Sequence, residues 1–170
     1  QMPDIAVSGA GWQEHLLDQV ARLYLAVEGY RRIQSLPDAH QADLRSLVGI
    51  TQKQEELQDS PGLFDTWLVL GRSVEEETAL KTQRTWLLGQ SSGQAALILN
   101  FAAAGAALDS SLSPGTALPA ELVFYESALP LRAMLRSREA PLALPLPLPA
   151  STSLVEATAG YSTALAVYPW

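Results

Sequence analysis

The chain of 170 residues has 48% hydrophobic and 17% charged residues, a formal net charge of −7, and no cysteine. Its apolar content argues against disorder, and its acidic balance disfavours nucleic acid and anionic membrane surfaces, because both attract Lys and Arg. The missing cysteines exclude disulfides, thiolate catalysis and cysteine-ligated zinc or iron–sulfur clusters for this chain.

Residues 11–35 are predicted to form one long amphipathic helix, because apolar residues recur there at steps of three and four. This apolar stripe consists of Trp12, Leu16, Val20, Leu23, Tyr24, Val27 and Tyr30. A stripe of this kind is typical of a helix that packs on a core.

Two shorter helices are predicted to follow. The first begins at Pro37 and ends at Val48, with Gly49 as the residue after its C-terminus. The second begins with the capping-box pair Thr51 and Gln54 and stops before residue 61. Residues 11–60 are therefore expected to be a helical unit.

The pattern then changes to that of strands, with alternation of side chains around Trp86. The predicted strands are residues 64–77, 80–88, 95–101, 121–125 and 131–138. The alanines in 94–107 leave a helix open for that segment. The fold class is α+β, with residues 64–138 as an antiparallel meander or small barrel that packs with the helical unit as one domain.

Residues 139–150 form a Pro-rich linker, and residues 151–170 form a C-terminal helix with Ser153 and Glu156 as its capping box. The helix carries a stripe of Leu154, Tyr161, Leu165 and Tyr168, and alanines occupy much of the remaining surface. Such a helix packs between two surfaces, meets another part of a longer protein, or docks on its own domain with a small-residue outer surface. The chain starts and stops abruptly, and we expect a fragment of something longer.

The segment from Gly89 to Gly93 matches G-x-S-x-G, the nucleophile elbow of α/β-hydrolases, with Ser91 as nucleophile. The elbow needs a helix after it and a downstream histidine, but His15 and His40 both lie upstream. A hairpin turn is the favoured interpretation, and hydrolysis by Ser91 is kept as an outside alternative. We therefore expect no enzyme.

No metal or other cofactor is expected, because His15 and His40 sit on separate helices without a ligand pattern. The run from Glu75 to Glu77 is expected at a solvated strand end, with cross-strand pairing to Lys81 or Arg84. Even spacing places Arg132, Arg136 and Arg138 on one strand face, and these are candidate interaction residues. Pairing with the excess acid is their default, since interleaved aromatic residues are missing from that segment.

Five further stretches of the chain stand out, and they are residues 65–71, 74–77, 83–89, 113–116 and 120–125. They resemble the region that follows the finger in bacterial SWIM zinc-finger family proteins, within a likeness that covers roughly 12–138. The family's C-x-C and C-x-H ligands are absent, so no zinc ligand carries over. The resemblance implies a larger bacterial protein whose finger binds DNA or protein, often encoded beside AAA+ ATPases of the MoxR type.

Two functions follow from these observations. The first is a non-catalytic scaffold or protein-interaction region of a SWIM-type protein, with another protein, the rest of a longer chain or an AAA+ ATPase system as partner. The candidate interaction residues of the C-terminal helix are Leu154, Tyr161, Leu165 and Tyr168. The alternative is a nucleic-acid-associated accessory domain, although nucleic acid is disfavoured for this chain by its charge. A cytoplasmic location without membrane contact is expected.

Overall fold

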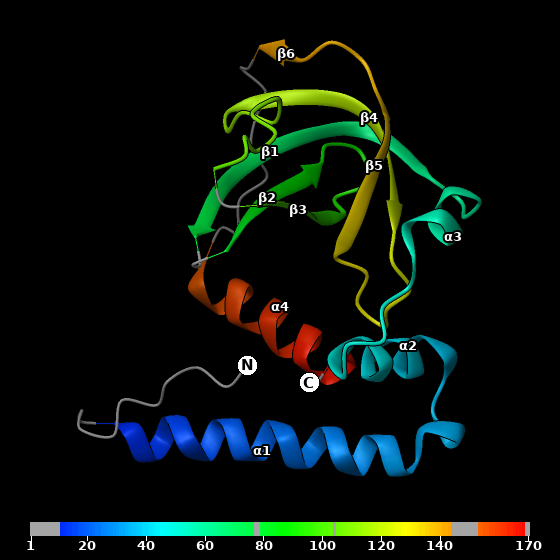
Figure 1. Ribbon diagram of the computed structural model, residues 1–170, viewed down its shortest axis with the longest axis vertical. Helices are drawn as coiled ribbons and strands as arrows, with labels where there is room; N and C mark the ends of the chain where they lie inside the picture. The colour runs from blue at the N-terminus through cyan, green and yellow to red at the C-terminus, as the bar shows by residue number, and fades with distance from the viewer. Residues whose placement is uncertain (1–10, 77–78, 104, 144–152, 169–170) are drawn as a thin grey trace.

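The computed structural model describes residues 11–76, 79–103, 105–143 and 153–168, and it has the α+β fold that the sequence predicts. The helices are α1 (Trp12–Arg31), α2 (Asp38–Leu47), α3 (Gln54–Gln58) and α4 (Leu154–Val167). In Figure 1, α2 and α4 lie below a β barrel, α1 lies below them, and α3 lies at the side of the barrel. A short 3₁₀ helix, η1 (Ile33–Ser35), joins α1 to α2. No helix in the described part of the chain is long and apolar enough to cross a membrane.

The helix ends show which local signals were correct. Gly49 has a φ of 89° after α2, and the N–H of Ile50 donates to the carbonyl of Arg45 at 2.8 Å, as in a Schellman motif. Ser153 accepts a hydrogen bond from the N–H of Glu156, which confirms the predicted cap of α4. The predicted cap of α3 is wrong, because its N-cap is Lys53 and no side chain caps it.

The strands are β1 (Leu63–Glu76), β2 (Leu80–Gly89), β3 (Ala95–Ala103), β4 (Thr116–Phe124), β5 (Arg132–Arg138) and β6 (Leu142–Ala143). The segment that could have been strand or helix is a strand up to Ala103. The predicted linker holds β6, and its residues 144–150 lie outside the described residues. The expected start of β4 at Glu121 is wrong, since the strand begins at Thr116.

Pro119 lies within β4, although a proline normally interrupts a central strand. In a strand, the N–H and C=O of one residue face the same edge, and the carbonyl of Pro119 accepts from the N–H of Glu139. Pro119 therefore turns its missing donor toward the break between β5 and β6, where the β4–β5 ladder has ended.

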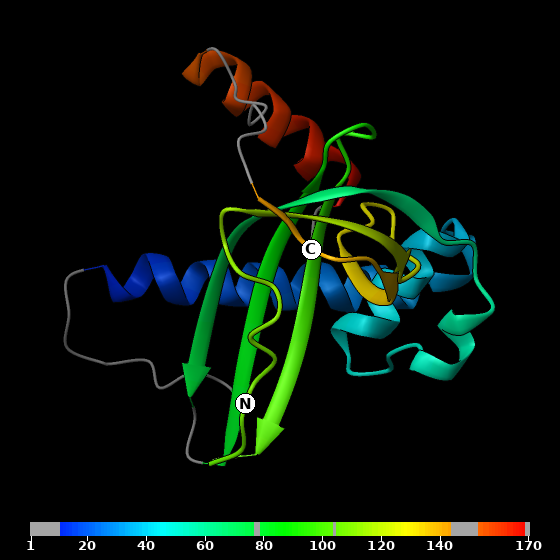
Figure 2. The ribbon, with the colours of Figure 1, turned by 90° about the horizontal axis from the view of Figure 1, so that it is seen from above.

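The strand pairing closes the sheet into a barrel, the second of the two predicted arrangements. The order is β1-β2-β3-β5-β4, and β4 also pairs with β1, with Leu63 opposite Leu122. All pairings are antiparallel except β3 with β5, which pair at Leu97 and Ile98. This is the strand order of an OB-fold, a partly open five-stranded Greek-key barrel. Figure 2 shows the long, curved β1, β2 and β3 from above.

The first half of β1 pairs with β4, and the second half pairs with β2. A register shift between Val69 and Gly71 lies where the strand turns from one partner to the other. Bulges of this kind bend a strand and increase its twist, which a closing barrel requires. The two halves of β1 thus hold opposite sides of the barrel together.

The core lies inside the barrel and takes residues from β1 to β5 and from the connection before β4. It consists of Trp67, Val69, Leu87, Ala96, Ile98, Leu112, Leu118, Ala120, Leu122 and Ala133. Trp67 donates its indole N–H to the carbonyl of Ala120 at 3.0 Å, and its ring lies 6.1 Å from that of Phe124. The largest core side chain is thereby held in one orientation.

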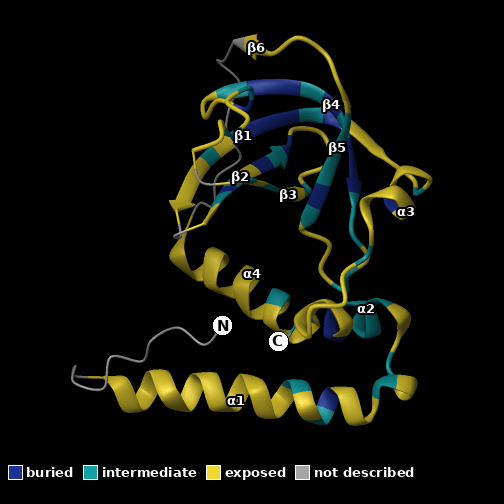
Figure 3. Cartoon of the chain, viewed as in Figure 1, coloured by how far each residue is buried: buried dark blue, intermediate teal, exposed yellow. Residues whose placement is uncertain are grey.

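The expectation that the stripe of α1 packs on a core is wrong within the residues that the structure describes. Every stripe residue is exposed, and Gly29, which is not part of the stripe, is the one buried residue of α1. Figure 3 shows α1 and α4 exposed along nearly their whole length, in contrast to the buried strands. The stripe predicted the helix correctly, but periodicity cannot show whether a partner for it lies in the same chain.

Candidate interaction surfaces

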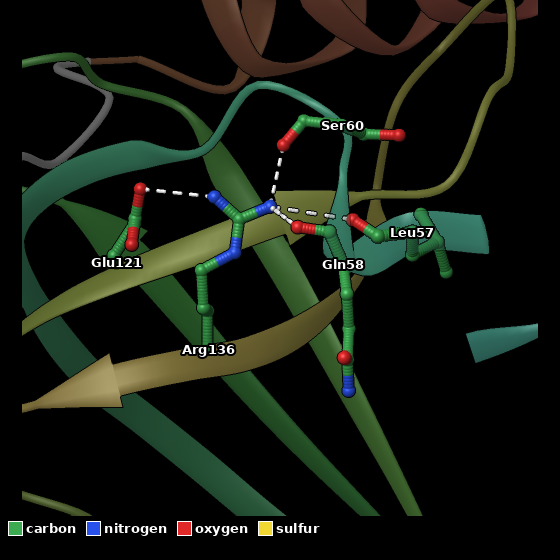
Figure 4. Close-up of polar contacts among 5 residues, drawn as sticks. All are labelled: Leu57, Gln58, Ser60, Glu121 and Arg136. Atoms are coloured by element: carbon green, nitrogen blue, oxygen red, sulfur yellow. Dashed lines mark hydrogen bonds and ion pairs between the residues drawn. The ribbon is translucent and has the colours of Figure 1, made fainter. Parts of the chain in front are cut away.

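The three arginines of β5 have three different surroundings. Arg136 forms an ion pair with Glu121 at 3.2 Å and donates to the carbonyl oxygens of Leu57, Gln58 and Ser60 (Figure 4). These carbonyls belong to the end of α3 and the residues after it, so Arg136 acts as a C-terminal cap supplied from a strand. Its guanidinium is thus engaged within the fold.

Arg138 and Arg132 lie elsewhere. Arg138 donates to the hydroxyl of Ser111. Hydrogen bonds from Ser111 lower the pKa of Asp109, and the charge of Arg138 lowers it further. The guanidinium of Arg132 stacks over the ring of Tyr125, with its central carbon 4.3 Å from the ring centre. A register shift in the β4–β5 pairing interrupts the even spacing from which the sequence placed these arginines on one face.

The G-x-S-x-G segment is a hairpin turn that the carboxylate of Asp65 holds in place. Asp65 is 5% exposed and accepts from the N–H of Ser92 at 2.8 Å, from the Ser92 hydroxyl at 2.7 Å and from the N–H of Ser91. A Cβ at Gly89 would lie 2.5 Å from the Asp65 oxygen and closer still to the Ser92 hydroxyl, so a larger residue would force the Asp65–Ser92 contact to shift. Strand β3 follows the turn, in place of the helix that a nucleophile elbow needs.

The hydrogen bonds to Asp65 also set its charge state. Partial burial alone would raise the pKa of this carboxyl, but the donors of Ser92, Ser91 and Thr66 together outweigh burial and lower the pKa below its ordinary value. Asp65 is therefore an ionised structural anchor for the turn.

The acidic run at the end of β1 pairs across the sheet as predicted. Glu75 meets Arg84 at 2.6 Å, and Glu76 meets Lys81 at 3.1 Å. Both pairs lie at the solvated end of the β1–β2 hairpin, where ion pairs contribute little to stability. The described residues contain no group of three His, Asp or Glu side chains arranged to hold a metal ion.

A cleft of about 670 Å³ separates the α2–α3 segment from the barrel. Its apolar lining includes Leu97, Leu99, Leu129, Leu131 and Tyr125, and its charged lining includes Asp43, Arg45, Lys53, Glu56, Glu126 and Arg132. Asp43 is buried and accepts from the N–H of Ala128 at 3.1 Å, which ties α2 to the connection between β4 and β5. This hydrogen bond therefore connects the helical side of the cleft with its barrel side.

The C-terminal end of α4 reaches the same cleft. Nε2 of His40 lies 3.1 Å from the carbonyl oxygen of Val167, and Tyr168 lines the cleft. Burial raises the pKa of Tyr168, and the Asp43 carboxylate raises it further. The other stripe residues of α4, which are Leu154, Tyr161 and Leu165, are exposed.

Aromatic residues that the sequence did not connect lie on the outer side of the barrel. In β2, Thr85 and Leu87 are buried, so Trp86 between them points outward, and in β3 the exposed Phe101 points the same way. Tyr125 joins them through its stacking with Arg132. The alternation in 80–88 was the available signal for Trp86, but its strand neighbours depend on the pairing of β3 with β5.

Together, these features define an OB-type barrel with attached helices whose apolar sides are exposed. Residues 1–48 match the family model described as the SWIM-associated four-helix bundle domain. This match confirms the resemblance to SWIM-type proteins over the N-terminal helices and is consistent with an accessory region of such a protein. No curated protein and no solved structure matches the chain.

Proposed function

We propose that this chain is a non-catalytic protein-interaction region of a SWIM-type protein, in which α1 and α4 pack against helices from outside the described residues. The exposed stripe of α1 carries this proposal. Within the match to a four-helix bundle domain, the described residues contain only the two α-helices α1 and α2. A bundle buries the apolar side of each helix, so further helices are needed to cover α1.

The stripe is large enough for a specific contact. Its seven residues include two tyrosines and a tryptophan, and each is at least one-third exposed. Aromatic side chains bury about 150–250 Å² each when covered, and a stable interface needs about 800 Å² from each partner. The stripe of one 20-residue helix is of that order.

The C-terminal helix, α4, also exposes apolar side chains. Leu154 is 85% exposed, and Tyr161 and Leu165 are also exposed, although the helix has few polar residues to face water. Its C-terminal end contacts His40 of α2 at the cleft, so the helix extends from α2 at that end. These residues are the proposed contact side of α4.

Several observations support a non-catalytic role. Ser91 lies in a hairpin turn held by Asp65, and His15 and His40 lie on α1 and α2, away from that turn in the chain. An AAA+ ATPase system as partner rests on the family resemblance alone. A cytoplasmic location fits the absence of cysteine and belongs to the same proposal.

The test is site-specific photo-crosslinking of the intact chain in a bacterial host that carries its natural neighbours. A photo-crosslinking residue at Leu23, on the stripe, should yield one defined adduct of higher mass. The same residue at Glu14, on the polar side of α1, is the matched control and should yield little. Equal adduct patterns from Leu23 and Glu14, or intramolecular crosslinks from Leu23 to the barrel, would refute the proposal.

A further inference from the structure

The second half of β1 has an edge that no other described strand covers. The pairing of β1 with β4 ends at Leu68, whereas its pairing with β2 continues to Glu76. Residues 72–76 are all exposed, and Figure 3 shows this end of β1 as an exposed arrow at the side of the barrel. Within the described residues, this half is therefore an edge strand, which offers its N–H and C=O groups to any strand that can pair with it.

The strand register shows which backbone groups face this open edge. The N–H of Leu97 in β3 bonds to the connection before β5, so Leu97 and its partner Trp86 turn their backbone groups away from each other. Trp86 therefore faces β1, where its partner Gly71 faces back toward β2. Alternation along β1 then directs the N–H and C=O groups of three residues to the open edge, and these are Arg72, Val74 and Glu76.

The side chains of this edge carry opposite charges at its two ends. Arg72 forms no ion pair within the described residues, although its charge helps to lower the pKa of Asp109. Glu75 and Glu76 contact cations of β2 on one side only, and their side chains remain 61% and 59% exposed. Charges on an edge strand oppose pairing where like charges meet, but they favour a register that brings opposite charges together.

A second copy of this chain supplies such a register. Two copies of β1 related by a two-fold axis run antiparallel, and their open backbone groups match only when the axis passes beside one residue. With the axis at Val74, Arg72 of each copy lies opposite Glu76 of the other. An axis at Arg72, Glu75 or Glu76 places like charges opposite each other, and an axis at Ser73 leaves Arg72 opposite Val74. The charges thus select the register centred on Val74.

We propose that the chain pairs with a second copy of itself through this edge of β1, antiparallel and with the two-fold axis at Val74. The β1, β2 and β3 strands of the two copies then form one continuous sheet, in which Glu76 lies between Lys81 of its own copy and Arg72 of the other. An interface of this length falls below about 1,200 Å², which is typical of weak, transient contacts. The edge is separate from the stripe of α1, so this proposal goes beyond the protein-interaction role and is tested independently of it.

Charge exchange across the edge tests the register. Sedimentation velocity of the intact chain at about 5–500 µM protein and about 50 mM salt, where exposed charges are weakly screened, should show a reversible dimer. R72E and E76R should each raise its dissociation constant about tenfold or more, because two opposite-charge pairs become two like-charge pairs. The double variant R72E/E76R restores opposite charges and should regain most of the affinity. The matched control E55R makes the same charge change at an exposed residue of α3 and should dimerise as the parent does.

A proline at Val74 tests the backbone pairing. The N–H of Val74 faces the open edge, so V74P keeps the β1–β2 ladder and removes a donor to the second copy. V74P should abolish the dimer, whereas V74A keeps the N–H and should retain it. Unchanged far-UV circular dichroism and melting temperature confirm that each variant folds. The proposal is overturned if the parent stays monomeric over the whole concentration range, if R72E/E76R dimerises no better than the single variants, or if V74P dimerises as V74A does.

Discussion

Replacement of Asp65 tests the physical basis of the β2–β3 hairpin most directly. This buried carboxylate accepts from Ser91, Ser92 and Thr66, and hydrogen bonds to a charged acceptor contribute about 1.5–3 kcal/mol each. The total loss of stability should be smaller than the sum for four separate hydrogen bonds, because the donors share one carboxylate and the exposed turn can bind water in its place. We expect D65A to lower the free energy of unfolding by about 3 kcal/mol, or the melting temperature by about 6–12 °C.

The pH dependence of this effect has a definite sign. The folded state lowers the pKa of Asp65 below its ordinary value of 3.8, so the stabilisation is present in full above pH 3.8. It is lost as the pH falls through the lowered folded-state pKa, because the protonated carboxyl accepts these bonds poorly. The stability difference between the parent and D65N should therefore be largest near neutral pH and shrink in that acidic range.

Urea unfolding monitored by circular dichroism measures these differences, with D59N as a control at an exposed aspartate that should change stability by less than about 0.5 kcal/mol. G89A should reproduce much of the D65A loss, because its methyl group occupies the space of the Asp65 oxygen. A D65A protein as stable as the parent, or a D65N deficit that is the same at pH 3 and pH 7, would contradict the assigned role of Asp65.

Two further predictions concern single contacts. R136M should lower the free energy of unfolding by about 2 kcal/mol, because it leaves Glu121 and the carbonyls after α3 without their donor. R136K should recover little of this stability, since one ammonium group cannot reach both Glu121 and the carbonyls. An R136K protein as stable to urea as the parent would refute this role of Arg136. G49A should lower the free energy of unfolding by about 1 kcal/mol, because Gly49 has positive φ. G160A, in the interior of α4 with open space around it, should raise helicity and stabilise the protein by up to about 1 kcal/mol. Circular dichroism and thermal melts measure both changes, and equal effects of the two variants would refute the C-terminal role of Gly49.

Local signals made much of the secondary structure predictable. Gly49 and Ser153 act through hydrogen bonds within a few residues, so their sequence patterns identified the ends of α2 and the start of α4. The alternation around Trp86 likewise identified β2, because the two sides of that strand face a core and solvent. The α+β class followed from these elements.

Features that depend on distant pairing were not predictable in the same way. The start of β4 depends on Pro119 facing a break in another strand, and the closure of the barrel depends on β4 returning to pair with β1. The arginines of β5 were grouped by spacing, but a register shift and the end of α3 give Arg136 its own partners. Trp86 and Phe101 share the outer side of the barrel only because β2 pairs with β3 in this register, which no spacing in the sequence reveals.

The separation of core and exposed helices bears on what the helices are for. The core cluster contains residues of β1 to β5 and of the connection before β4, and none from α1 or α4. The barrel therefore does not depend on the apolar sides of those helices for its stability. Within the described residues those sides remain in contact with water, and a contiguous exposed apolar surface of that kind marks a contact site in a soluble protein or an aggregation hazard. Because the match to a bundle domain covers α1 and not the barrel, we infer that the barrel is the self-sufficient part, and that α1 completes its packing only with helices from outside the described residues.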